Sequence, residues 1–375
     1  MAPNLSSATR IGLNILAFLG LSLTLYLGHT VIIPLVIAAM LAVILYPAAT
    51  WLNRKLHIPW FFACLSVILA VVAVNVAIFV GFAFSIPSML EQLPNPRDTD
   101  RLEQIYSKSR DVVASVAPGS VNRVMPVDPQ RSTVFAYVKK FLEGDVIVNQ
   151  FVVLGKAVGV WLLQSIIILF VMLFMMLEGA FLGARIREIF GTNGVIQSRV
   201  RHALTEMIEA IRSYLVWRTI VNCGLGLFLG IIYSLMDLKQ PWTWALLTAL
   251  LSYIPYIGTI IAGIPPVLDA LINCSPWHAL FIMLIYIIVV TVEGYLIVPL
   301  VMGRSMDLNA TTVMLACLYW DLVWGTMGLF LAMPVMAGIR AICLHTEGWE
   351  TWANLMSTEK GVKMMKKPNY GSDTL

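Results

Sequence analysis

The chain has 375 residues, of which 59% are hydrophobic and only 12% are charged. Soluble domains contain about 45–50% apolar and about 25% charged residues, so this composition excludes an ordinary soluble protein. The net charge of +4 is small and the basic residues are dispersed, which argues against nucleic acid as a partner. We therefore expect an all-α polytopic membrane protein.

Long apolar runs alternate with polar stretches along the chain. A helix of about 20 residues crosses a hydrocarbon core of about 30 Å, so the longest run must hold more than one element. From this pattern we expect about eight transmembrane helices. The apolar runs cover residues 11–28, 31–52, 58–87, 150–177, 214–236, 241–300 and 310–343.

Basic residues cluster before the first apolar run, between the second and third, after the fourth and after the last. Under the positive-inside rule these four segments are cytoplasmic. We expect a multi-pass protein of the cell's inner (plasma) membrane with both termini in the cytoplasm. The clusters contain Arg10, Arg54, Lys55, Arg185, Arg187, Arg199, Arg201, Arg212, Arg218, Arg340, Lys360, Lys363, Lys366 and Lys367.

The same pattern divides the chain into segments. They are N-terminal transmembrane helices 1–3 at 1–87, an extracytoplasmic helical region at 88–149, transmembrane helix 4 at 150–177, a cytoplasmic amphipathic helix region at 178–213, a C-terminal transmembrane core at 214–343 and a cytoplasmic tail at 344–375.

Residues 88–149 are rich in charge and proline, and we expect a small helical ectodomain there. Thr99 or Asp100 can cap a helix that runs to about Val116, and a second helix is predicted near 132–143. The region has too few aromatic residues for a large core of its own. We expect it to lean on the membrane domain or on a neighbouring subunit.

Residues 195–218 show the clearest amphipathic pattern, with one apolar stripe and a charged opposite face. Such a helix suits either the membrane surface or a position against another helix. In the next apolar run, Gly226 and Gly230 stand four residues apart and permit close helix packing. The run lacks the Lys-Ser/Thr of a phosphate loop.

No motif of an enzyme is recognisable, and we expect the protein not to be an enzyme. The five cysteines lie in or beside apolar runs without a CxxC pair, so neither a disulfide framework nor a zinc site is expected. We expect no cofactor and no metal.

The stretch "SYIPYIGTIIAGIPPVLDALI", residues 252–272, is apolar yet rich in residues that break helices. Pro255 and the pair Pro265-Pro266 each remove helix hydrogen bonds, and Gly258 and Gly263 permit non-helical angles. In hydrocarbon, such a backbone must be enclosed by protein or line a watery cavity. We therefore predict a broken or re-entrant segment, with two breaks, that forms a transport pathway.

Acidic residues follow this segment. Asp269 comes just after the second predicted break, and Glu293 lies in the next span, seven residues after Tyr286 on the same helical face. Intramembrane acids usually face a protein interior or a pathway. We predict Asp269 in the pathway or in a structural contact. Glu293 is predicted to couple transport to an ion or proton, or to pair with an arginine between helices.

Three stretches resemble successive signatures of one family: "YIPYIGTIIAGIPP", "VEGYLIVPLVMGRSMDLNATTVML" and "WGTMGLFLAMPVMAGIR". The family is the autoinducer-2 exporter family, also called the PerM-type permeases, and the layout of nearly the whole chain is similar to it. The matching residues are Pro255, Gly258, Pro265, Glu293, Pro299, Gly303, Gly325, Gly328 and Pro334.

The chain departs from the family pattern at some positions. Thr259 stands where the family often has proline, Asn309-Ala310 replaces a common His-Pro, and Asp269 is outside the pattern. We expect Thr259 and Asp269 to bear on the choice of cargo. In the short loop after Pro299, Arg304 and Asp307 could form an ion pair.

The resemblance implies a membrane transporter with eight spans that forms homo-oligomers, pentamers among them. Members of the family are associated with export of the signal autoinducer-2, and others with sodium/proton exchange. Our leading hypothesis is a secondary transporter, in the direction of export, for a small polar solute and driven by a proton or cation gradient. The alternatives are a sodium (lithium)/proton antiporter and, from another class, a membrane scaffold or a passive channel.

Overall fold

The computed structural model describes most of the chain, and the described part is built from helices without a strand. This confirms the predicted all-α fold class. The described residues are 7–92, 99–116, 118–119, 121–143, 164–179, 181, 185, 194–255, 257–302, 308–346 and 348–358.

Five described helices are long and apolar enough to cross a membrane. They are His29–Lys55, Trp60–Gly81, Gln197–Leu235, Pro276–Ile297 and Thr326–His345. Further apolar helices in the described part are shorter, among them Gln164–Gly179 within the predicted fourth span. The count of about eight spans stays a prediction.

The chain divides into two compact units. The first unit contains Met1–Leu69, Gln164–Arg218 and Met302–Leu375, and the second contains Ala70–Leu163 and Thr219–Val301. The long helices α3 (Trp60–Gln92) and α8 (Gly194–Leu235) contribute residues to both units.

The core of the first unit contains a pair of tryptophans and lies around two consecutive helices of the C-terminal part. Its helices are α1 (Ser7–Leu27), α2 (His29–Lys55), α13 (Ala310–Trp324), α14 (Thr326–His345) and α15 (Glu350–Met356). Trp320 and Trp324 of α13 are buried, with ring centroids 4.6 Å apart. The indole N–H of Trp324 donates to the carbonyl of Leu25 at 3.1 Å, which fixes α1 against α13.

A tight turn joins α13 to α14. Gly325 has a φ of 61°, a left-handed angle that favours glycine. A Cβ at Gly328 would collide with the carbonyl oxygen of Trp320. The two glycines of "WGTMG" therefore let the two helices meet closely.

Asn309 holds the C-terminal end of α15 against the start of α13. Its side-chain oxygen accepts from the backbone N–H of Thr312 at 2.8 Å, as an N-cap does. Its side-chain nitrogen donates to the carbonyl of Leu355 at 2.7 Å. Asn309, which departs from the family pattern, thus connects α15 to α13 by hydrogen bonds in this chain.

The predicted amphipathic helix at 195–218 and the span after it form one helix, α8, of 42 residues. At 1.5 Å per residue it is about 63 Å long, roughly twice the thickness of a hydrocarbon core. Met207 and Ile211 of its apolar stripe pack at Gly338 of α14. The amphipathic stretch was expected either on the membrane surface or against another helix, and the structure shows it packed against another helix.

The second unit contains the ectodomain helices. They are α4 (Thr99–Val116), α5 (Val121–Val124), the 3₁₀ helix Pro129–Arg131 and α6 (Thr133–Glu143). Their small core consists of Leu102, Tyr106, Met125 and Phe135. The helices α4 and α6 match the two predicted helices closely, and α4 contacts α11, a helix of an apolar span.

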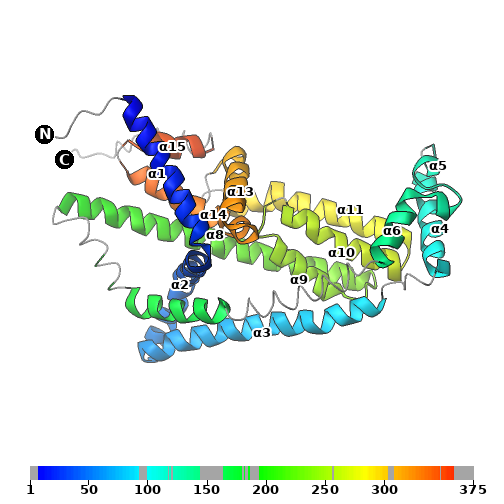
Figure 1. The fold of residues 1–375 in the computed structure, drawn as a ribbon. Coiled ribbons are helices and arrows are strands. Elements are labelled where there is room, and N and C mark those ends of the chain that lie inside the picture. Colours follow the sequence, from blue (N-terminus) through cyan, green and yellow to red (C-terminus); the bar gives the residue numbers. More distant parts are fainter. Residues whose placement is uncertain are drawn as a thin grey trace, which may run out of the picture. The chain divides into compact units, whose positions relative to one another are not determined.

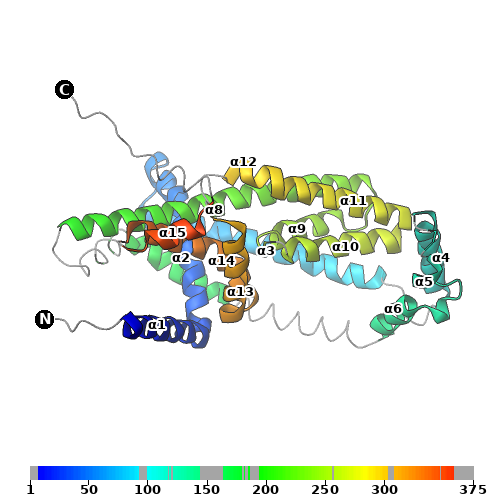
Figure 2. The same cartoon turned by 90° about the horizontal axis from the view of Figure 1, so that it is seen from above.

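The apolar part of the second unit follows α8 in the sequence (Figures 1 and 2). It consists of α9 (Pro241–Leu251), α10 (Ile257–Asn273), α11 (Pro276–Val292), the π-helical turn Glu293–Ile297 and α12 (Val298–Met302). Both views show α9, α10 and α11 side by side.

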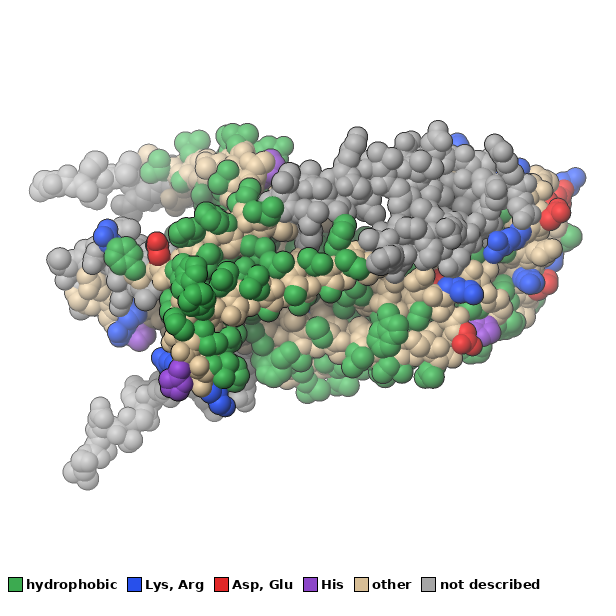
Figure 3. Space-filling model, turned by 90° about the horizontal axis from the view of Figure 1, so that it is seen from below, with side chains coloured by type: hydrophobic (Ala, Val, Ile, Leu, Met, Phe, Trp, Pro, Cys, Tyr) green, Lys and Arg blue, Asp and Glu red, His purple; other side chains and the backbone are tan. Residues whose placement is uncertain are grey.

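Large hydrophobic side chains are exposed on these helices, as a lipid-facing surface requires. On the face shown in Figure 3, hydrophobic side chains cover the helices of the spans, and charged side chains gather around the ectodomain helices. This supports the location of the protein in a membrane.

The α13–α14 turn provides a test of the fold. We expect Gly328→Ala to destabilise the protein by about 1–3 kcal/mol, because the added methyl group cannot fit beside Trp320. The matched control is Gly224→Ala in α8, where a Cβ meets nothing within 4 Å. Thermal unfolding of the detergent-purified variants measures both. Equal melting temperatures of the two variants would contradict the packing described.

Candidate functional site

The segment predicted to be broken forms the second leg of a helical hairpin. The helix α9 ends at Leu251, the chain turns at Ser252–Pro255, and α10 begins at Ile257. Short hydrogen-bonded turns close the tip, since the N–H of Ile254 donates to the carbonyl of Leu251 at 2.9 Å. A Cβ at Gly258 would collide with that same carbonyl oxygen, so this position requires glycine.

The second predicted break, at Pro265-Pro266, is wrong. Both prolines lie inside α10, which is continuous from Ile257 to Asn273. The two prolines cannot bond the carbonyls of Ile261 and Ala262, but that cost is limited to two hydrogen bonds. Pro266 is fully buried, and packing holds the helix together around it.

The legs of the hairpin are short. With 11 residues α9 is about 16 Å long, and with 17 residues α10 is about 25 Å long. A hydrocarbon core is about 30 Å thick, so α9 cannot cross it alone. This favours a re-entrant hairpin over two complete spans.

Asp269 ties the two legs together at the end of the hairpin opposite the tip. Its Oδ2 accepts from the indole N–H of Trp244 at 2.7 Å and from the backbone N–H of Gln240 at 3.2 Å. Its Oδ1 accepts from the side chain of Asn273 at 2.8 Å. The carboxylate is 7% exposed and fully engaged in these contacts. Its predicted place in a pathway stays a prediction.

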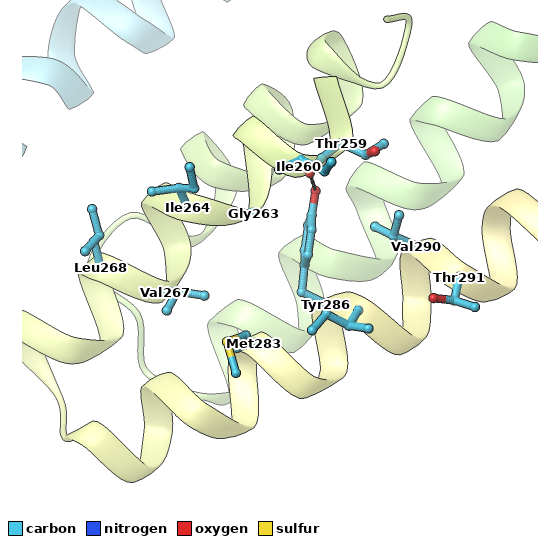
Figure 4. Close-up of a pocket in the computed structure, with 11 residues that line it drawn as sticks. Thr259, Ile260, Gly263, Ile264, Val267, Leu268, Met283, Tyr286, Val290 and Thr291 are labelled. Carbon is cyan, nitrogen blue, oxygen red and sulfur yellow. Dashed lines mark hydrogen bonds between the residues drawn. The ribbon is translucent and has the colours of Figure 1, made fainter. Parts of the chain in front are cut away.

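The side chain of Tyr286 of α11 reaches the N-terminal half of α10 (Figure 4). Its hydroxyl donates to the backbone carbonyl of Thr259, and its ring lies so close to Gly263 that a Cβ there would clash. The predicted pathway residues Thr259 and Gly263 therefore meet the tyrosine that sequence analysis placed on the face of Glu293.

A hollow of about 410 Å³ opens beside this contact. Its walls are mainly aliphatic, and the ring of Tyr286 forms part of them (Figure 4). The lining residues are Thr259, Ile260, Gly263, Ile264, Val267, Leu268, Met283, Tyr286, Ile287, Val290 and Thr291. Ile260 is 69% exposed, so the hollow faces outward from the unit.

Polar side chains also lie on the inner side of Tyr286. The side chains of Tyr233 on α8 and Tyr286 on α11 both lie close to Thr248 on α9. The hydroxyl of Thr248 donates to the carbonyl of Trp244 at 2.9 Å. Three helices of the second unit, α8, α9 and α11, thus bring hydroxyl groups into a common region.

The helices α8 and α9 run antiparallel in close contact. A Cβ at Gly226 would lie 3.0 Å from the Cβ of Ala249, and one at Gly230 would lie 2.7 Å from the ring of Trp242. Nearer the tip, the hydroxyls of Thr219 and Tyr253 are 2.6 Å apart. The two glycines predicted to permit close packing lie against α9.

Glu293 is 4% exposed and begins the π-helical turn Glu293–Ile297. It lies seven residues, about 10 Å, beyond Tyr286 along the helix. Because α10 and α11 are antiparallel neighbours joined by Cys274-Ser275, this places Glu293 at the level of the hairpin tip. Single π-turns in helices frequently occur at functional sites.

Asn222 of α8 was missed in the sequence analysis. It is 1% exposed, and neither its side-chain nitrogen nor its side-chain oxygen has a hydrogen-bond partner among the described residues. Leaving such a buried group unsatisfied costs about 1–3 kcal/mol. An asparagine inside the apolar run "LVWRTIVNCGLGLFLG" is the signal that could have identified it.

Some of the remaining predicted residues are not described by the structure. Arg304 and Asp307, predicted as an ion pair, lie outside the described residues, as does Gly303. Within the described part of the chain, no group of three His, Cys, Asp or Glu residues could hold a metal ion.

The hydrogen bond between Asp269 and Trp244 can be tested by a double-mutant cycle. We expect Trp244→Phe and Asp269→Asn each to lower the free energy of unfolding. Because both variants remove the same charged hydrogen bond, the double variant should lose about 1–3 kcal/mol less than the sum of the two single losses. Denaturant unfolding in detergent measures the three variants. Strict additivity would contradict the contact.

Comparison with known proteins gives the geometry its context. The AI-2E family transporter model matches residues 13–348. The AI-2 transport protein TqsA of Escherichia coli (strain K12) is 24% identical over 350 residues, which cover 92% of this chain and 96% of that protein. YhhT of the same strain is 22% identical over 330 residues, 87% of this chain and 88% of that protein.

A shorter match is to a relative from another organism. YrrI of Bacillus subtilis (strain 168) is 27% identical over 142 residues, 38% of this chain and 40% of that protein. The family match covers nearly the whole chain, including α8, the hairpin and the turn at Glu293. The chain therefore belongs to the AI-2E transporter family and is a multi-pass membrane transporter.

Proposed function

We propose that the protein is a secondary transporter that exports a small polar solute and is coupled to a proton or cation gradient. The observation that carries this proposal is Glu293, a carboxyl group 4% exposed within a helix of an apolar span and at the level of the turn of a hairpin. Intramembrane acids of this kind are costly and mark ion and proton pathways.

The pathway in this proposal follows the inner side of the hairpin. It runs from the tip, held by Pro255 and Gly258, past Thr259 and Gly263, which also border the outer hollow, to the level of Pro265, Pro266 and Asp269. Tyr286 separates this inner side from the outer hollow of about 410 Å³. Broken helices that present freed backbone groups are the common means by which transporters bind solutes and ions.

The cargo class is inferred from two features. The inner side of the hairpin offers hydroxyl and amide groups, which suit a polar solute. A relative that covers nearly the same length is named an AI-2 transport protein. We therefore propose a signal of the autoinducer-2 kind among the solutes to test.

A sodium (lithium)/proton antiporter is the second candidate. Pro265 and Pro266 cannot bond the carbonyls of Ile261 and Ala262, and carbonyl oxygens are suitable ligands for a small cation. In this alternative those carbonyls and Glu293 would serve the ion. A scaffold or a passive channel would require no coupling group at all.

We further propose that the protein resides in the inner membrane with both termini in the cytoplasm. The four basic clusters support this orientation. The many exposed aliphatic side chains of α10 and α11 leave room for homo-oligomers, such as pentamers, as well as lipid.

The role of Glu293 is tested in proteoliposomes. Wild-type protein should move labelled autoinducer-2 at a rate that depends on an imposed pH gradient. We expect Glu293→Gln to reduce that dependence at least tenfold, because the amide cannot carry a proton. Asp321→Asn, a change at an exposed acid of α13, is the matched control and should behave as wild type. Normal coupled transport by Glu293→Gln would remove the proposed role.

The antiporter alternative has a separate readout. Vesicles that contain the protein and a trapped pH dye are given Na⁺ or Li⁺ outside. Proton movement that requires either cation and disappears in Glu293→Gln would favour the antiporter over the solute exporter. Indifference to both cations would exclude it. Absence of any flux, together with a stable protein partner, would instead support a scaffold.

A further inference from the structure

Asn222 differs from Asp269 and Thr248, two other buried polar side chains of the second unit. Asp269 has three donors, and Thr248 donates to a carbonyl. Both polar atoms of Asn222 lack a partner among the described residues, although the side chain is 1% exposed. Nothing in the packing of α8 requires an amide there, because the residues of the same helical face are mainly apolar.

The surroundings place Asn222 between the hairpin tip and the tyrosine region. Three residues earlier, Thr219 meets Tyr253 of the tip at 2.6 Å. Four residues later, Gly226 packs against Ala249 of α9. Asn222 is therefore level with the end of α9, where Ser252 is fully buried, and about one turn from the level of Thr248. This is also the level assigned to Glu293.

The two open atoms restrict the chemistry of a ligand. A side-chain amide offers two N–H donors and one oxygen acceptor. A bare cation would use only the oxygen and leave the N–H groups buried without a partner. A carboxylate would use only the N–H groups and would lie at the level of a carboxyl group. A hydroxyl group can accept from the amide nitrogen and donate to the amide oxygen at once.

We propose that Asn222 is a specificity-determining residue of the transport site and binds a hydroxyl group of a neutral, hydroxyl-bearing solute. The inference rests on the proposed transport function and deepens it, because it names the side chain that recognises the cargo. It also assigns the recognition of solute to α8 and leaves the coupling role to Glu293.

The test uses purified full-length protein and thermal unfolding with added probes. The probes are D-ribose and erythritol as neutral hydroxylated solutes, Na⁺ as a cation and succinate as an anion. The variants are Asn222→Leu, which has nearly the same shape without polar atoms, and Asn222→Thr, which has one hydroxyl group in place of the amide. The matched control is Asn75→Leu in α3, where the amide donates to the carbonyl of Val71 at 2.9 Å.

We expect ribose or erythritol to raise the melting temperature of wild type and of Asn75→Leu. Asn222→Leu should bind the same probe about tenfold more weakly or worse, and Asn222→Thr should be intermediate. Without probe, Asn222→Leu should melt at or above the wild-type temperature, because it removes an unsatisfied buried amide. Na⁺ and succinate should give no shift that depends on residue 222.

Three results would overturn the inference. In the first, Asn222→Leu binds ribose and erythritol as well as wild type does. In the second, Asn222→Leu and Asn222→Thr both melt below the wild-type temperature without a probe. In the third, wild type binds neither hydroxylated probe. A measurement of coupled transport in proteoliposomes distinguishes failure of the proposed role of Asn222 from failure of the proposed transport function. If Asn222→Leu transports as wild type does, the proposed transport function is retained and the proposed role of Asn222 is contradicted. If wild type shows no flux, the proposed function falls.

Discussion

Inside a bilayer no water can bond the backbone groups that a helix break leaves open, so a break must be closed by the protein itself. The hairpin of α9 and α10 meets this constraint at its tip, where the N–H of Ile254 returns to the carbonyl of Leu251. Close neighbours complete the enclosure, since Gly226 brings α8 against α9 and Gly263 brings the ring of Tyr286 against α10. Asp269 then fixes the two legs at the opposite end. We propose that polar side chains in the sheltered region that results serve transport.

Local chemistry was sufficient to predict the break at Pro255, the helices of the ectodomain and the all-helical class, because each depends on neighbours in sequence. It was misleading at Pro265-Pro266, where the loss of two hydrogen bonds is outweighed by packing that only the folded chain supplies. The π-helical turn at Glu293 has no comparable local signature. The unpartnered state of Asn222 could not be predicted either, because a partner is a property of tertiary structure.

The buried polar groups of the second unit divide into two kinds. The carboxylate of Asp269 is saturated by three donors, which is typical of a structural contact. Asn222 and Glu293 lie at the level of the tip, where the backbone is irregular. Membership of the AI-2E transporter family is consistent with a transport site near the tip, where we propose that Asn222 and Glu293 act.

The central claim, that the inner side of the hairpin is the pathway, is tested most directly by thiol labelling in membranes. In a protein whose five cysteines are replaced, Ser252→Cys would sit at a fully buried position of the tip and Ile260→Cys at a position 69% exposed on the outer side. We predict that a small water-soluble thiol reagent labels Ser252→Cys during transport and spares Ile260→Cys, because the pathway is wet and the outer side faces lipid. Labelling of Ile260→Cys with an inert Ser252→Cys would contradict the account.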